Sequence, residues 1–351
     1  MTMRSDLPRL HPSSELFAAV GAARQSMAAE LVTHADGPER GVRSALLQND
    51  RVSLEVVVDR ALDIAAARID GVPVAWRPPM GIVGPWYVEN RGFGPQRTFL
   101  GGLLTTCGLD HVGAPRERSA ERFGYAARTI DEFPQHGRIS GTPAHLTGYG
   151  VQLDPDGSPV AVVEGEIAQV SLFGEHLVLR RRVSLAYGST TIRIDDTVTN
   201  EGYASSPLAV LYHVNVGWPV LAPGAQVLID GVRRRGVGDG STVPAPERGR
   251  PERSWLYIAA ADDAGRASAS VRNPRIDGAG AGGVRVGWNA EVMPTVTHWE
   301  SANTAGHYAV GLEPSTTLPS GPPGERRFPL IEPGERVPLG IEIELSLGAA
   351  D

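Results

Sequence analysis

The sequence has 351 residues, of which 41% are apolar and 21% charged, so it can bury a core as one large domain or two ordinary ones. Its net charge of −7 and isoelectric point of about 5.8 argue against a nucleic-acid partner, because a phosphate-binding surface is rich in Lys and Arg. A small-molecule ligand is favoured instead. The sequence shows no run of 18 apolar residues and no apolar leader before Pro12, which predicts a cytoplasmic protein without a membrane partner.

Two features of the composition limit the chemistry. All 33 basic residues are arginine, and without lysine the chain cannot form a Schiff base with a carbonyl substrate or with pyridoxal phosphate. The single cysteine, Cys107, excludes an intramolecular disulfide and agrees with a reducing compartment. We therefore expect an enzyme that needs no organic cofactor.

Alternation of apolar and polar residues with a period of two recurs along most of the chain and predicts half-buried β-strands. It is clearest at Val52–Val56, Leu177–Leu185 and Leu339–Leu347. The other predicted strands are Val160–Val170, Thr191–Thr199, Leu208–Val216, Ala225–Ile229, Trp255–Ala260, Val284–Trp288 and Tyr308–Leu312.

The chain has 42 glycines and 28 prolines, which supply many turns between the short strands, and strands do not alternate with helices along it. This pattern predicts an all-β fold, a mostly antiparallel sandwich or barrel with few short helices. A helical period occurs at Ser14–Ala23, inside an N-terminal lead-in that we place at residues 1–30. Strand patterns of one character lie on both sides of residues 236–253, which we interpret as a surface loop rich in Arg, Pro and Gly. We therefore predict one domain spanning residues 1–351.

His213 and Asn215 are polar residues on a predicted central strand. They follow the apolar run Leu208–Leu211, and the two-residue repeat of a strand places them on the same face. Burying two polar side chains costs free energy unless they are hydrogen-bonded or used in function. A histidine on a strand is more often structural than catalytic, so this pattern alone leaves both interpretations open.

Glu313 ends the apolar strand Tyr308–Leu312 and precedes Pro314. The glycine at 311 permits close approach of a ligand or another backbone, and the proline ends the ladder of hydrogen bonds. One interpretation is a solvated carboxylate at a strand end. The other is a general base at the rim of a cleft.

Arginines and tryptophans near these residues are candidates for sugar binding. Arg91 and Arg97 can donate paired hydrogen bonds to hydroxyls or a carboxylate, and Arg138 beside His136 is a further candidate for substrate binding. Tryptophan faces commonly pack on the apolar face of a sugar ring. Solvated arginines and core tryptophans are the competing interpretation. Of four tryptophans near the polar segments we expect two, Trp288 and Trp299, to contact a ligand.

Six segments form an ordered set along the chain. They are Asp59-Arg60-Ala61-Leu62-Asp63-Ile64, Phe99-Leu100-Gly101-Gly102-Leu103, Thr106-Cys107-Gly108-Leu109, His136-Gly137-Arg138, Tyr212-His213-Val214-Asn215 and Gly311-Leu312-Glu313-Pro314. Taken together, over roughly residues 45–347, they resemble the galactose mutarotase superfamily, in particular its aldose-1-epimerase-like branch.

This resemblance implies a β-supersandwich whose concave face holds a carbohydrate, and an isomerase that interconverts sugar anomers without a metal. His136 would contact the substrate near its ring oxygen and anomeric hydroxyl. His213 would be the general acid and Glu313 the base. The chemistry agrees with these residue types, because ring opening needs one proton removed and another delivered, and a histidine beside a carboxylate can do both.

Two other functions remain open from the sequence. A metal-dependent sugar isomerase or lyase would use His111, His136, His213 or Glu313 as ligands, although no close metal-ligand spacing occurs. A non-catalytic sugar-binding protein would use the aromatic residues alone. Convergence of His213 and Glu313 on one pocket within about 5–7 Å is the arrangement that the epimerase interpretation expects. The oligomeric state, monomer or homodimer, is also open.

Overall fold

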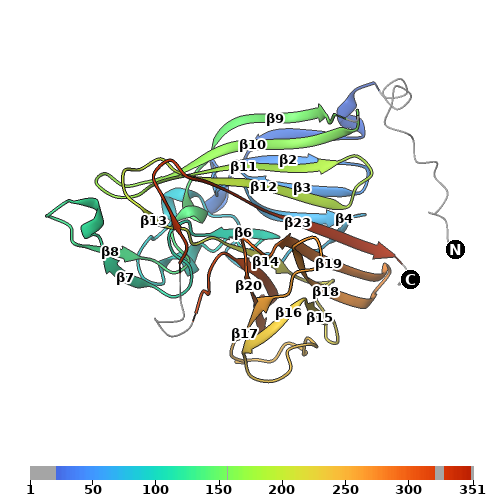
Figure 1. Cartoon of the computed structure of the whole chain (residues 1–351). Helices are drawn as coiled ribbons and strands as arrows, with labels where there is room; N and C mark the ends of the chain where they lie inside the picture. The colour runs from blue at the N-terminus through green and yellow to red at the C-terminus, as the bar shows by residue number, and fades with distance from the viewer. Residues whose placement is uncertain (1–20, 156, 321–327, 349–351) are drawn as a thin grey trace.

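The computed structural model describes residues 21–155, 157–320 and 328–348. Most of the predicted helix Ser14–Ala23 lies outside the described residues. The fold is all-β, as predicted, with every strand pair antiparallel and two large sheets (Figure 1).

The larger sheet has eleven strands. In spatial order they are β1 (Ala28–Thr33), β2 (Arg43–Gln48), β3 (Val52–Val57), β4 (Asp63–Ile69), β6 (Leu104–Cys107), β14 (Leu211–Val216), β21 (Tyr308–Ser315), β20 (Thr295–Ala302), β17 (Arg253–Ala259) and β16 (Gly231–Arg235), with β5 (Val72–Pro73) paired to β4.

The second sheet has eight strands. In order they are β15 (Gln226–Ile229), β18 (Arg266–Ile276), β19 (Gly280–Asn289), β23 (Arg336–Gly348), β12 (Thr191–Asn200), β11 (His176–Ala186), β10 (Pro159–Val170) and β9 (His145–Leu153).

Short elements complete the described chain. Two small sheets pair β7 (Arg116–Ser119) with β8 (Ile130–Phe133), which project to one side in Figure 1, and β13 (Ser206–Pro207) with β22 (Leu330–Ile331). The helical turns are η1 (Ala23–Gln25), η2 (Gly37–Glu39), η3 (Pro85–Tyr87), η4 (Gly94–Thr98), η5 (Glu121–Phe123) and η6 (Ile139–Gly141). No helix of the described residues is long and apolar enough to cross a membrane.

The inner faces of the two large sheets meet in a hydrophobic core. Val56 and Val214 of the larger sheet and Val183 and Ile343 of the second sheet are fully buried in it. Alternate residues of strands such as β3 and β23 point into this core, which explains the period-two pattern of apolar residues in their sequences.

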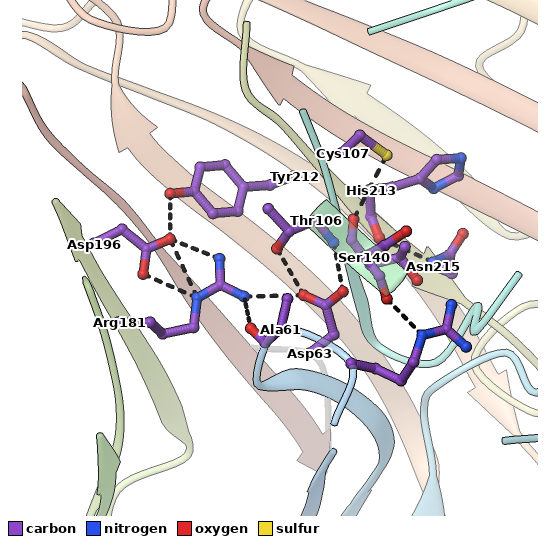
Figure 2. A network of polar contacts seen from close by, with 12 residues as sticks. Ala61, Asp63, Thr106, Cys107, Ser140, Arg181, Asp196, Tyr212, His213 and Asn215 are labelled. Atoms are coloured by element: carbon purple, nitrogen blue, oxygen red, sulfur yellow. Dashed lines mark hydrogen bonds and ion pairs between the residues drawn. The ribbon is translucent and has the colours of Figure 1, made fainter. Parts of the chain in front are cut away.

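A buried polar network also connects the sheets. Arg181 of β11 contacts Asp63 of β4 at 2.9 Å and Asp196 of β12 at 2.6 Å, with no exposed side-chain surface on any of the three. Tyr212 of β14 donates to Asp196 at 2.7 Å, and Thr106 of β6 donates to Asp63 through its hydroxyl at 2.7 Å (Figure 2). The central strands β6 and β14 are thus held against the second sheet by charge-assisted hydrogen bonds.

Strand alternation sends the neighbours of these network residues to the opposite face. Tyr212 points into the network and His213 away from it, as Figure 2 shows. On β6, Thr106 faces the network, so Thr105 and Cys107 face outward with His213. Every residue of β14 is buried, because loops cover the outer face of the sheet at this point.

Candidate active site

A cavity of about 610 Å³ lies on the outer face of the eleven-stranded sheet. Its floor is formed by outward residues of β6, β14, β21 and β20, and its walls by loops that contain residues 76–99 and 135–140. This volume is typical of a small-molecule site.

His213 and Glu313 meet at the floor of the cavity. The register of β14 and β21, with Val214 opposite Leu312, places the two residues directly across from each other. Their side chains are 8% and 5% exposed, and His213 Nε2 lies 3.2 Å from Glu313 Oε1. The pair is closer than the 5–7 Å expected from the sequence, so a sugar must sit above both groups and not between them.

Gly311 gives the pair its space. It lies two residues before Glu313 on the same face of β21, and a Cβ there would be 2.8 Å from His213 Cε1 and 2.9 Å from Glu313 Oε1. Real Cβ atoms do not approach other atoms this closely, so a side chain at 311 would displace the pair.

His136 reaches the cavity from a loop beside β6. Its ring centroid is 6.2 Å from that of His213, with the two rings edge to face. The backbone of His136 has φ of 59°, a left-handed conformation that is costly for a residue with a side chain. Hydrogen bonds from His136 N to Gly113 O and from Gly108 N to His136 O hold it there.

Burial makes the neutral forms of these groups favourable. It lowers the pKa of His213 to about 3, with the neighbouring His136 contributing, and lowers the pKa of His136 to about 4. Burial also raises the pKa of Glu313 to about 8, and the Glu252 carboxylate adds to that rise. Burial therefore favours a protonated Glu313 and uncharged histidines in the free site.

Two aromatic rings flank His213. Phe99 and Trp299 contact it edge to face, with centroids at 5.3 and 5.5 Å, and Trp76 packs against Phe99 at 6.2 Å and against Trp299 at 6.1 Å. Trp299 Nε1 donates to Glu252 Oε2 at 2.8 Å. Trp76 and Glu252 are residues that sequence reasoning missed, since both lie in irregular segments without a strand pattern; Glu252 precedes β17 at the end of a long connection.

Several buried polar atoms around the cavity have no hydrogen-bond partner. They belong to cavity-lining residues and are Thr98 Oγ1, Gln135 Oε1, His136 Nδ1, His213 Nδ1 and Thr297 Oγ1. Buried polar groups are normally paired, so the residues around the cavity leave hydrogen-bonding capacity unused.

Of the residues proposed from the sequence, Trp299 and His136 line the cavity but four others do not. Asn215 is fully buried, and its amide donates to the backbone carbonyls of Gly101 and His213. It supports the strand and does not line the cavity, so we propose no sugar contact for it.

Arg91, Arg138 and Trp288 do not line the cavity either. Arg91 is exposed and ion-paired with Glu132 at 3.2 Å. Arg138 turns away toward Asp110, 4.0 Å distant, and packs on the Phe133 ring. Trp288 is fully buried in the core on β19 and donates to the Met293 carbonyl. Sequence pattern placed these residues near polar segments without showing which way their side chains point.

The residues considered as metal ligands are not assembled as such a site. Among the described residues, no group of three or more His, Cys, Asp or Glu side chains is arranged to hold a metal ion. His111 instead hydrogen-bonds through Nε2 with the Ala114 carbonyl at 2.8 Å.

Comparison with solved structures finds the same fold. A "putative aldose 1-epimerase" of Klebsiella pneumoniae has a TM-score of 0.78 at 19% identity, covering 90% of this chain and 83% of that one. A galactose mutarotase-like protein of Clostridium acetobutylicum has a TM-score of 0.63 at 13% identity, covering 93% and 100%. The galactose 1-epimerase of Lactobacillus acidophilus has a TM-score of 0.59 at 13% identity, covering 92% and 100%.

Sequence comparison adds a family assignment. No curated protein matches the chain. The family model of DUF4432, a domain of unknown function, matches residues 39–345, which is most of the sequence. The chain therefore has the fold of galactose mutarotase-like proteins, as its sequence predicted, and belongs to the DUF4432 family.

Proposed function

We propose that the protein is an aldose 1-epimerase-like enzyme that interconverts the anomers of a sugar, with His213 and Glu313 as its proton-transfer pair. The observation that carries this proposal is the contact of the two side chains at 3.2 Å on the floor of a cavity, nearly buried yet facing the space where a ligand would lie. The names of the structural neighbours agree with this activity.

The pair supplies the two proton transfers that ring opening requires. In the free site the proton is on Glu313, and its transfer to His213 across the 3.2 Å contact gives an imidazolium and a carboxylate with no change in total charge. Glu313 then takes the proton of the anomeric hydroxyl while His213 protonates the ring oxygen. The bond between the anomeric carbon and the ring oxygen breaks and leaves an aldehyde and a hydroxyl.

Closure on the other face completes the reaction. Rotation about the bond beside the aldehyde exposes its opposite face, and the same two transfers in reverse give the other anomer. Because the anomeric hydroxyl and the ring oxygen are attached to one carbon, two groups in contact with each other can reach both. No other reactant is consumed.

The remaining lining suits a sugar. Thr297 and Gln135 are polar residues of the lining, and the rings of Phe99 and Trp299 offer apolar surface for the carbon–hydrogen face of a pyranose. His136 beside His213 is placed to contact the reacting oxygens, as the family resemblance implies.

The test is anomer exchange measured by NMR on a panel of aldoses. We expect Glu313→Gln and His213→Asn each to slow exchange by about 10²-fold or more, the usual contribution of a positioned acid or base. Matched controls are Glu291→Gln and His145→Asn, exposed residues outside the cavity that should keep the parent rate. A full rate for Glu313→Gln would remove it as the proton acceptor. Sugar binding without acceleration of any aldose would favour the sugar-binding protein instead.

A further inference from the structure

The cavity has an unusual charge balance for its size. Among the described residues that line it, the carboxyl groups are Glu313 on the floor and Glu252 at the edge. Glu252 accepts one hydrogen bond from Trp299, and no Arg or His of the described chain forms an ion pair with it. An exposed carboxylate beside a largely apolar wall gives the cavity a negative potential, which low-dielectric surroundings strengthen.

Among the described residues that line the cavity, no cationic side chain offsets that potential. Arg60 is the guanidinium that lines the described part of the cavity, and it is 2% exposed. Its three nitrogens donate to the carbonyls of Ser140, Val83 and Thr98, which leaves little capacity for a ligand. Burial also disfavours a positive charge on His213 and His136, because it lowers the pKa of both imidazoles.

The aromatic residues favour the same kind of ligand. Phe99 and Trp299 contact His213, and Trp76 packs against both of these rings, with centroids 5.3 to 6.2 Å apart. The faces of Trp and Phe attract cations through their quadrupoles, most strongly where water is excluded. The Glu252 carboxylate is hydrogen-bonded to the Trp299 ring, so a cation there can be attracted by both the negative charge and the ring face.

We propose that the cavity selects an aldose that carries an ammonium group, an amino sugar, over a neutral sugar, and a neutral sugar over an anionic one. Glu252 is the specificity-determining residue: it pairs with the ammonium group while the Trp299 ring packs beside it. This inference rests on the proposed function for its kinetic test but has a binding test of its own.

The kinetic experiment measures kcat/KM for anomer exchange of three sugars of the same stereochemistry: an amino sugar, the neutral parent and its phosphate. At pH 6 we expect the amino sugar to exceed the neutral sugar by roughly tenfold and the phosphate to fall below it by a similar factor. An amine beside an electron-withdrawing carbon loses its proton near about pH 8, as α-amino groups do. The preference, taken as a ratio to the neutral sugar at the same pH, should therefore shrink at pH 9.

Variants connect the preference with Glu252. Glu252→Gln should reduce the ratio of amino to neutral sugar at pH 6 to near one, because the amide keeps the size and the bond from Trp299 but removes the charge. Glu291→Gln removes one exposed carboxylate outside the cavity and should leave the ratio unchanged. Loss of the preference in both variants would mean that net charge, and not Glu252, determines it, which would overturn the assignment.

Binding separates this inference from the proposed function. Methyl glycosides of the same three sugars cannot open, and their affinities can be followed by fluorescence of the cavity tryptophans. If affinity falls from the amino glycoside to the neutral one and then to the phosphate, but the protein accelerates anomer exchange of no free sugar, the epimerase proposal fails and the charge selection stands. If free sugars are accelerated but the neutral or phosphorylated one is preferred, the charge selection fails and the epimerase proposal stands. Absence of both binding and acceleration overturns both.

Discussion

At the scale of single residues, the His213–Glu313 pair is a neutral unit with one transferable proton. Burial disfavours the charged form of each partner, which raises the pKa of the carboxyl to about 8 and lowers that of the imidazole to about 3. The groups that face Glu313 are His213 from β14, Cys107 from β6, Thr297 from β20 and Glu252 before β17. None of them is a cation that would stabilise the carboxylate.

This arrangement predicts the pH profile on a neutral sugar. The pair must keep one proton, and that proton is lost as pH rises through the pKa of Glu313, so kcat/KM should fall above about pH 8. Because His213 gains a second proton only near pH 3, we expect no decrease between pH 5 and pH 7. Glu252→Gln should move the alkaline decrease to lower pH, since the carboxylate contributes to the raised pKa. A profile that falls below pH 6.5 would show instead that His213 has an ordinary pKa.

Sequence reasoning located the pair but not its surroundings. His213 and Glu313 were found because a polar residue on an apolar strand needs an explanation, and that signal is local. Arg138 and Trp288 also lie near polar segments of the sequence, but neither faces the cavity. Arg138 points toward Asp110, and Trp288 is buried in the core. Glu252 is adjacent to the site only through the pairing of β17 with β20, which brings Ser254 beside Trp299, and no short segment of sequence shows such a contact.

At the scale of elements, strand β21 is built around the pair. It is hydrogen-bonded to β14 on one side and β20 on the other, so its backbone has little freedom to move. Gly311 and Glu313 occupy successive outward positions, while Leu312 between them is buried in the core. The strand thus holds the Glu313 carboxylate in position, and the missing side chain at Gly311 leaves space for the His213 imidazole.

Gly311→Ala should therefore disturb the site more than the fold. A Cβ placed 2.8 Å from His213 Cε1 must push the imidazole or the Glu313 carboxylate aside, and a displacement of about 1 Å can reduce turnover by about 10²-fold. Gly148→Ala on β9 is the matched control, because a Cβ there makes an ordinary contact of 3.5 Å with Glu164. The measurements are the anomer exchange rate and the melting temperature of both variants, and we expect Gly311→Ala to lower the rate much more than the melting temperature. Parent activity in Gly311→Ala would show that the site tolerates a shifted pair.

The strands that sequence analysis predicted are those with long alternating apolar residues, such as β11 and β23. Strand β18 was missed because it alternates small residues, with Ala267 and Ala269 facing the core, and β20 because Thr, His and Trp interrupt its pattern. The loops over the cavity were not predictable in this way, since their course is set by single hydrogen bonds such as that from Trp76 Nε1 to the Gly306 carbonyl.

At the scale of the whole molecule, the two sheets share both a hydrophobic core and the buried Arg181 network. Arg181 forms ion pairs with both Asp63 and Asp196, which lie on strands of different sheets. Removing one partner of such a buried group leaves an uncompensated charge, which typically costs 3–5 kcal/mol. Strands of the larger sheet come from the beginning, the middle and the end of the chain, so no half of the sequence can complete a sheet without the other.

We therefore propose that residues 21–348 unfold as one cooperative unit, and we expect a single calorimetric transition. Arg181→Met should shift that transition to lower temperature as a whole, because both sheets lose the same network. Arg193→Met removes an exposed arginine that pairs with Glu342 at 2.6 Å, and as a surface ion pair it should cost no more than about 1 kcal/mol. Two resolved transitions in the parent protein, or a second transition appearing only in Arg181→Met, would contradict the expectation and show that the sheets can unfold separately.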